Sequence, residues 1–171
     1  MINILENTIS TKFKDISEHK MKLLMAILSD ESVRKWVAYL TENPEEEKSV
    51  SIDTVLKENV VNSKINEDIL QEDKILLFIE LLEGDFNFNA LSTEHWVVNI
   101  ILPNEYWFIK QYAKERIYEI AYRIARAIDN QRLIGIGKVE IKGYKQEQMN
   151  RHWTGLSLFV EAVYGYIPEV E

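Results

Sequence analysis

The residues that come closest to a catalytic motif are Glu140 and Lys142, two positions apart in a stretch of alternating apolar and charged residues. Alternate residues of a strand point to the same face, so a carboxylate and a lysine at this spacing can meet at one phosphate, as in metal-dependent restriction-type nucleases. That chemistry also requires an aspartate, usually after a proline, on an adjoining strand. Pro103 is followed by Asn104, and Asp85 lies in a predicted glycine turn. A strand with one solvated face shows the same alternation, and we predict that the protein is not an enzyme.

Other chemistry finds no better support in the residue pattern. His19, His95 and His152 have no metal-ligand spacing, and the chain contains no cysteine. No G-x-S-x-G motif places a serine on a strand-to-helix turn. Gly135 and Gly137 precede a predicted strand rather than a helix, so they are typical of a helix exit and not of a phosphate-binding loop. We therefore expect no metal and no cofactor.

The composition indicates a soluble globular protein with an acidic surface. Acidic residues outnumber basic ones 28 to 20, for a net charge of −8. Affinity for DNA comes largely from lysines and arginines that neutralise phosphates, so this balance argues against a DNA-gripping protein. It suits a basic partner, or a surface past which DNA slides. The chain has no run of 18 apolar residues, so we predict no membrane span. The absence of cysteine favours a cytoplasmic setting.

The periodicity of the last hundred residues predicts how the elements are ordered. Apolar residues alternate near Trp96, recur at helical spacing after Ile117, and alternate again at 139–141 and 156–162. Lys74–Leu82 is a continuous apolar run that a following glycine turn favours as a strand. The order is β-β-α-β-β. It predicts an α+β fold in which one long helix packs on a small antiparallel or mixed sheet of about four strands.

The chain divides into three predicted segments that we expect to form one compact unit. Residues 1–43 are helical, with Ser29–Ser32 as the boundary between two helices and Pro44 as the stop. Residues 44–73 are an irregular connector in which a short helix or strand is expected, because so long a structureless loop is unusual. Residues 74–171 form the α+β domain. Within it, 84–92 is a predicted loop or extended hairpin tip, 143–154 is a predicted loop, and the main helix is expected to begin between Glu105 and Lys114.

Aromatic residues crowd the second half of the chain and identify candidate contact residues. Tyr118 and Tyr122 lie one helical turn apart and away from the isoleucine stripe, which is typical of an interface rather than a core. Arg123 and Arg126 belong to the exposed face of the same predicted helix. The predicted polar loop 143–154 adds two more candidates. The proposed interaction residues are Tyr118, Tyr122, Arg123, Arg126, Gln146 and Arg151.

The arrangement from about Lys74 to Tyr166 resembles the tail-terminator and neck, or head–tail joining, proteins of tailed bacteriophages. The similarity lies in segments 95–101, 116–129, 133–141 and 155–164, including the Leu-Ile-Gly-Ile-Gly-Lys-Val-Glu-Ile stretch after the helix. The resemblance implies a subunit of a homo-oligomeric ring, often a hexamer, that caps the tail tube and joins it to the head connector. It implies tube or connector proteins as partners, a place in the virion, and DNA that passes without being specifically bound.

A second hypothesis uses the acidic composition alone. A small cytoplasmic binding module, comparable to an immunity or adaptor protein, would present an acidic surface to a basic partner protein. Pattern and spacing do not separate a tail terminator from an adjacent neck ring, and they leave the oligomer number, the strand order, the host and the phage type open.

Overall fold

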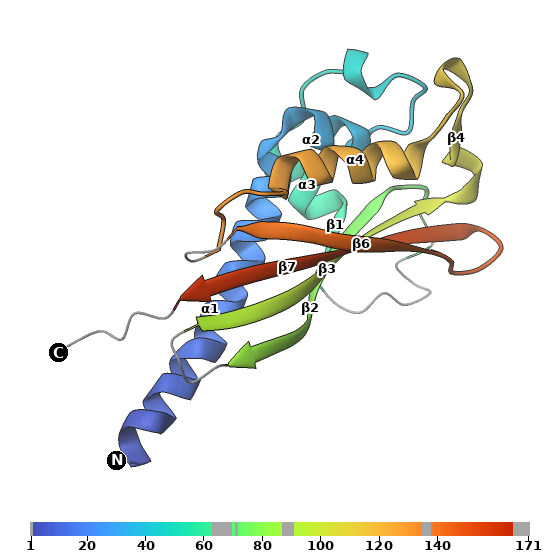
Figure 1. Ribbon diagram of the computed structural model, residues 1–171. Coiled ribbons are helices and arrows are strands. Elements are labelled where there is room, and N and C mark those ends of the chain that lie inside the picture. Colours follow the sequence, from blue (N-terminus) through green and yellow to red (C-terminus); the bar gives the residue numbers. More distant parts are fainter. Residues whose placement is uncertain (1, 63–69, 71, 87–90, 135–137, 166–171) are drawn as a thin grey trace.

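The computed structural model describes residues 2–62, 70, 72–86, 91–134 and 138–165 and has an α+β fold (Figure 1). The α-helices of these residues are α1 (Ile2–Ser29), α2 (Glu31–Ala38), α3 (Ile52–Glu58) and α4 (Arg116–Ile128). The strands are β1 (Val60–Val61), β2 (Leu76–Phe86), β3 (Leu91–Pro103), β4 (Phe108–Ile109), β5 (Lys114–Glu115), β6 (Val139–Gln148) and β7 (Trp153–Gly165). Short 3-10 turns occupy Pro44–Glu46, Asn104–Tyr106 and Lys110–Tyr112.

The main sheet has five strands in the order β1-β2-β3-β7-β6. Strand β1 runs parallel to β2, and the other neighbours are antiparallel, so the sheet is mixed. The long central pair β3–β7 is in register from Leu91 opposite Gly165 to Pro103 opposite Trp153. Strands β4 and β5 form a separate two-stranded sheet. The predicted fold class is confirmed, with β1 as a strand that the apolar pattern does not reveal.

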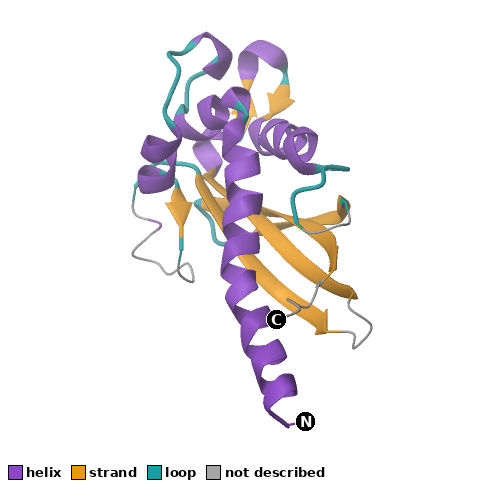
Figure 2. Ribbon diagram, turned by 90° about the vertical axis from the view of Figure 1, so that its left-hand side faces the viewer, coloured by secondary structure: helices purple, strands orange, loops and turns teal. Residues whose placement is uncertain are grey.

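The helices pack on one face of the main sheet (Figures 1 and 2). Alternate residues of β3 and β7 point to this face, as their spacing predicts, and join the isoleucine stripe of α4 in one core. Burying such stripes is the main favourable contribution to folding. The core residues from these three elements are Trp96, Val98, Ile100, Leu102, Ile117, Ile120, Ala121, Ile124, Ile128, Leu156, Leu158, Val160 and Ala162.

The N-terminal helices contribute to the same core. Leu23, Leu24, Ile27 and Leu28 of α1 are buried, and α2 adds Val33, Trp36 and Val37. The boundary predicted at Ser29–Ser32 is confirmed, because the Asp30 carboxylate accepts the N–H groups of Ser32 and Val33 as the N-cap of α2. None of the described helices is long and apolar enough to cross a lipid bilayer.

The predicted connector at 44–73 contains a short helix and a short strand, as its length suggests. After the turn at Pro44–Glu46, Ser51 caps α3 by accepting the N–H of Thr54, and β1 follows directly. Asn59 joins these elements to the sheet, since its side-chain amide donates to the carbonyls of Val37 and Ile75. Residues 63–69 and 71 of the predicted connector lie outside the described residues.

Three predicted boundaries are wrong. Helix α2 ends at Ala38 rather than near Pro44, because Tyr39 takes an extended conformation. Of the two alternatives for 84–92, the structure has the extended hairpin tip, since β2 continues to Phe86 and β3 begins at Leu91; residues 87–90 lie outside the described part. Strand β6 continues to Gln148, so half of the predicted loop 143–154 is also strand; its residues 144–148 are all exposed, which leaves no apolar alternation to detect. Helix α4 begins at Arg116 rather than by Lys114, because the Arg116 N–H donates to the Trp107 carbonyl and closes the small β4–β5 sheet ahead of it.

Candidate interaction site

An aromatic face gathers around Tyr118 where α4 meets β6. We define it by Trp107, Phe108, Tyr118, Tyr122 and Tyr144. The Tyr118 ring lies edge-on to Trp107 and to Tyr144, with centroids 6.3 and 6.2 Å apart. Burial, helped by Glu115 and Tyr144, raises the pKa of Tyr118 above its ordinary value. Two of the predicted contact residues meet here, because this hydroxyl donates to the side-chain carbonyl of Gln146.

Two more predicted contact residues lie together on the outer side of α4. Tyr122 is 59% exposed, and the Arg126 guanidinium stands 5.8 Å from the centroid of its ring. A cation over an aromatic ring at an exposed site contributes roughly 0.5–1 kcal/mol. This contact holds the arginine over the ring, so a ring and a positive charge face outward as one unit.

The prediction that Arg123 lies on the exposed face of the helix is wrong, because its side chain packs inward and has a structural role. It lies 4.0 Å above the Trp36 ring and bonds the carboxylates of Glu119 and Glu45 at 2.7 and 3.2 Å. Its side chain is only 14% exposed. Burial raises the pKa of Glu45, but hydrogen bonds from Ser32, Trp36 and Arg123 outweigh it and hold that pKa below its ordinary value. Arg123 therefore joins α4 to α2 and the turn after it.

Arg116 is a second arginine of α4 whose role only the structure shows. It is 2% exposed, and its guanidinium donates to the carbonyls of Tyr106, Tyr39, Leu40 and Thr41 at 2.6–3.3 Å. Burial lowers the pKa of Arg116, although Glu42 acts in the opposite direction. The four carbonyls belong to two loops far apart in the sequence, so one buried cation ties these loops to the start of α4.

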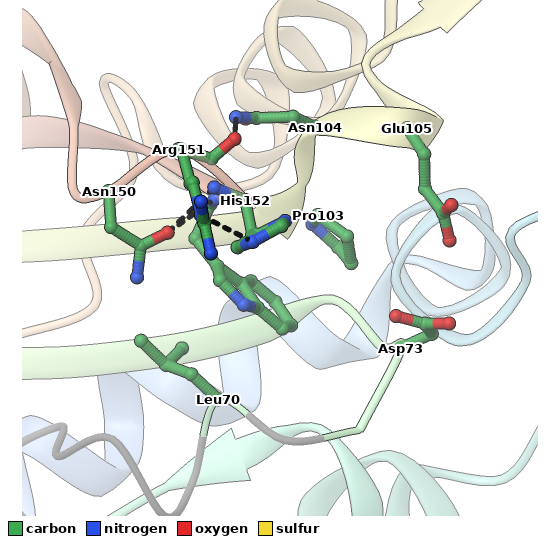
Figure 3. Close-up of a pocket in the computed structure, with 9 residues that line it drawn as sticks. Leu70, Asp73, Pro103, Asn104, Glu105, Asn150, Arg151 and His152 are labelled. Carbon is green, nitrogen blue, oxygen red and sulfur yellow. Dashed lines mark hydrogen bonds between the residues drawn. The ribbon is translucent and has the colours of Figure 1, made fainter.

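The last predicted contact residue, Arg151, borders a hollow of about 710 Å³ at the β6–β7 turn (Figure 3). Arg151 Nε lies 3.0 Å from His152 Nε2, and the Arg151 carbonyl accepts the Asn104 amide at 3.0 Å. Across the hollow, Figure 3 shows the carboxylates of Asp73 and Glu105. The hollow thus carries one arginine facing two acids, and neither Tyr122 nor Arg126 lines it.

A second hollow links this region to the aromatic face. It measures about 410 Å³ and lies beside Trp107, Phe108, Gln146 and Gln148. Asn104 and Glu105 border both hollows. A single surface therefore runs from Arg151, past the exposed amides of β6, to Tyr118 and Tyr144.

The residues with catalytic spacing are engaged with one another. Lys142 bonds the carboxylates of Glu140 and Glu161 at 2.5 and 3.0 Å, and these hydrogen bonds raise the pKa of Lys142. His19 and Glu94 form a buried pair that the pattern does not predict, with Nδ1 at 2.9 and 3.0 Å from the two carboxylate oxygens. Trp96 Nε1 donates to the same carboxylate at 3.0 Å. The pair joins α1 to β3 inside the core.

Comparison with known proteins gives one family. No curated protein matches the chain. A model of the YomW family matches residues 30–162, which take in α2, the main sheet and α4. The match covers more than half of the chain. The chain therefore belongs to the YomW family, a phage-related protein family.

Proposed function

We propose that the protein is a structural virion subunit that assembles into a ring at the phage neck, at or beside the tail-terminator position, and joins the tail tube to the head connector. Membership of a phage-related family and the α+β arrangement of one helical layer on a sheet support this proposal. The observation that carries it is the aromatic face. Tyr122 and Tyr144 are 59% and 65% exposed on α4 and β6, which are regular elements.

Exposed tyrosines on rigid elements suit subunit association. Each presents a large apolar area with a polar tip and loses few rotatable bonds on contact, so it contributes more per residue than a flexible side chain. Single exposed aromatics are ordinary, but here the Tyr118 ring contacts Trp107 and Tyr144, and Tyr122 lies one helical turn from Tyr118 on α4. The acidic balance of the chain complements this role, because a surface of net negative charge lets DNA pass without holding it.

Electron microscopy of negatively stained protein tests the proposal directly. The purified chain would be imaged alone and after mixing with tail tubes assembled from the tube protein of the same phage. We expect closed rings of one diameter, and rings seated at tube ends. Particles of monomer size that never occupy a tube end would contradict the proposal. Binding of a basic host or phage protein by such a monomer would instead favour the acidic binding module.

Matched variants connect that result to the aromatic face. Tyr122→Ser removes an exposed aromatic side chain without changing the core. We expect this variant to form no oligomeric rings. Met21→Ser on α1 removes a side chain of similar exposure, 52%, far from this face, and should leave ring formation unchanged. Equal loss in both variants would mean that ring formation does not depend on the aromatic face.

A further inference from the structure

The outer edge of β6 has one half that is covered and one half that is open. At its start the backbone is engaged by the segment after α4: the Asn130 N–H donates to the Val139 carbonyl at 2.7 Å, and the Val139 N–H donates to the Gln131 carbonyl at 2.8 Å. The Asp129 carboxylate accepts the Ile141 N–H at 3.0 Å. A bulge between Ile141 and Gly143 then shifts the register with β7. These contacts close the edge only as far as the bulge.

Beyond the bulge the edge of β6 faces outward. The Met149 N–H donates to the Trp153 carbonyl of β7 at 3.0 Å. Backbone groups alternate in direction along a strand, so those of Tyr144, Gln146 and Gln148 point away from β7. Within the described residues no strand lies on that side, because β6 ends the strand order. An open edge of this kind is a template for another strand.

The charges on this half of β6 are self-complementary. Lys145 and Glu147 flank Gln146, and all three are exposed. If a second copy lies antiparallel with Gln146 opposite Gln146, each Lys145 stands opposite a Glu147. These are non-hydrogen-bonded positions, where side chains approach most closely. A shift of two residues would place Lys145 opposite Lys145 or Glu147 opposite Glu147, so the charges select one register.

The shape of the surface beside β6 fits the same register. Tyr144 of the second copy would stand opposite Gln148, on the face of the sheet that carries the helices. The hollow of about 410 Å³ lies there, lined by Gln146, Gln148, Trp107 and Phe108. Tyr144 is 65% exposed in the single chain. The register set by charge thus brings the exposed Tyr144 of each copy to a hollow of the other that Trp107 and Phe108 line together with polar side chains.

We propose that two copies of this chain join through residues 144–148 of β6, antiparallel and centred on Gln146, to make one continuous sheet across the pair. Backbone groups of Tyr144, Gln146 and Gln148 form about six hydrogen bonds between the strands. Two Lys145–Glu147 ion pairs lie on one face, and two Tyr144 rings fill hollows on the other. The contact is two-fold and uses Tyr144, Trp107 and Phe108 of the aromatic face, whereas Tyr122 and Arg126 on α4 remain exposed and would carry the contacts of the proposed ring.

Cysteine cross-linking tests the register, because the chain has no cysteine of its own. In Gln146→Cys the two thiols lie directly opposite, with Cα atoms about 5.5 Å apart, within the range of a disulfide. In Gln148→Cys each thiol lies opposite Tyr144, out of reach of its equivalent. Under mild oxidation we expect a disulfide-linked dimer from the first variant and little from the second. Equal cross-linking of both, or of neither, would overturn the proposal.

Charge exchange tests the ion pairs by an independent measurement of dimer dissociation. Lys145→Glu places like charges opposite each other twice and should weaken the pair roughly tenfold. Adding Glu147→Lys to it restores opposite charges and should restore the wild-type affinity. Lys22→Glu, which breaks an exposed pair with Glu18 on α1, is the control that should change nothing. If Lys145→Glu leaves the dissociation constant of the dimer unchanged, the paired β6 edge is contradicted even if rings form. If Lys145→Glu weakens the dimer and no rings form, the paired edge is supported and only the proposed ring is contradicted.

Discussion

Helix α4 directs two arginines inward, and the edge of β6 carries the charged residues Lys145 and Glu147. The two regions contain similar residue types but differ in function. Arg116 and Arg123 are nearly enclosed, and each holds loops or helices of the same chain together. Lys145 and Glu147 are exposed and bond within their own strand. A buried polar group that loses its partners is costly, whereas an exposed ion pair contributes little. A charged residue that stabilises the fold therefore differs from one proposed for association in its burial, and not in its residue type.

Removing the Arg116 guanidinium is the largest expected disturbance on the inward side. Arg116→Ala leaves four loop carbonyls without their donor in a site that is 2% exposed. We expect the free energy of unfolding to fall by about 3 kcal/mol, as measured by urea denaturation. Arg116→Lys, which keeps the charge but not the planar fork, should recover part of this loss. A fall below about 1 kcal/mol would show that water replaces the guanidinium.

The His19–Glu94 pair is the next strongest inward contact. Glu94→Ala takes the acceptor from both His19 and Trp96 in the core, where Glu94 is 1% exposed. The expected loss in unfolding free energy is about 2 kcal/mol. Glu83→Ala changes an exposed carboxylate on the neighbouring strand and should stay within about 0.5 kcal/mol. Equal losses of unfolding free energy in the two variants would contradict the conclusion that burial decides the contribution of a carboxylate.

Arg123→Ala should have a smaller effect, about 1–2 kcal/mol, since the side chain keeps some contact with water. The variant also alters the pH dependence. Burial raises the pKa of Glu119, but Lys114 and Arg123 outweigh it, and the pKa of Glu119, like that of Glu45, lies below the ordinary 4.5. A carboxylate with a lowered folded pKa stabilises the protein above its unfolded pKa.

That stabilisation is lost as the pH falls through the folded pKa. The wild-type urea midpoint should therefore drop below about pH 4.5, and its advantage over Arg123→Ala should narrow there. An advantage that stays constant from pH 7 to pH 3 would show that the Trp36 contact, and not the carboxylates, accounts for the effect of Arg123.

Substitutions of the exposed residues should have the smallest effect on the stability of the single chain. Lys145→Glu and Tyr122→Ser are each expected to change the unfolding free energy of the single chain by less than about 0.5 kcal/mol. Thermal unfolding of dilute protein measures this. A loss above about 1.5 kcal/mol in either variant would place that side chain among the structural residues instead.

The sequence predicts the parts of the fold in which one face is buried. The alternation in β3 and β7 and the stripe of α4 are visible because apolar residues recur at a fixed period, and the structure buries them as expected. Strand β6 beyond Gly143 escapes detection because both of its faces are exposed. Arg116 and Glu94 escape because nothing local distinguishes a buried charge from a solvated one; their partners lie about 75 residues away in the chain.

The spacing of the predicted contact residues does not show how they are arranged. Tyr118 and Gln146 come from different predicted elements, and the structure joins them through one hydrogen bond. Arg123 has the same helical position pattern as Arg126, yet it turns toward Trp36, an aromatic residue of a helix that the local pattern cannot place. Their roles in association stay predictions that the variants above address.

The most direct test of self-association is the molar mass in solution, measured by light scattering across a concentration series. We expect a mass of at least two chains of 20.1 kDa at high concentration, with Lys145→Glu shifted toward a single chain at the same concentrations. A mass of 20.1 kDa at every concentration for the wild-type protein would contradict both the paired β6 edge and the ring.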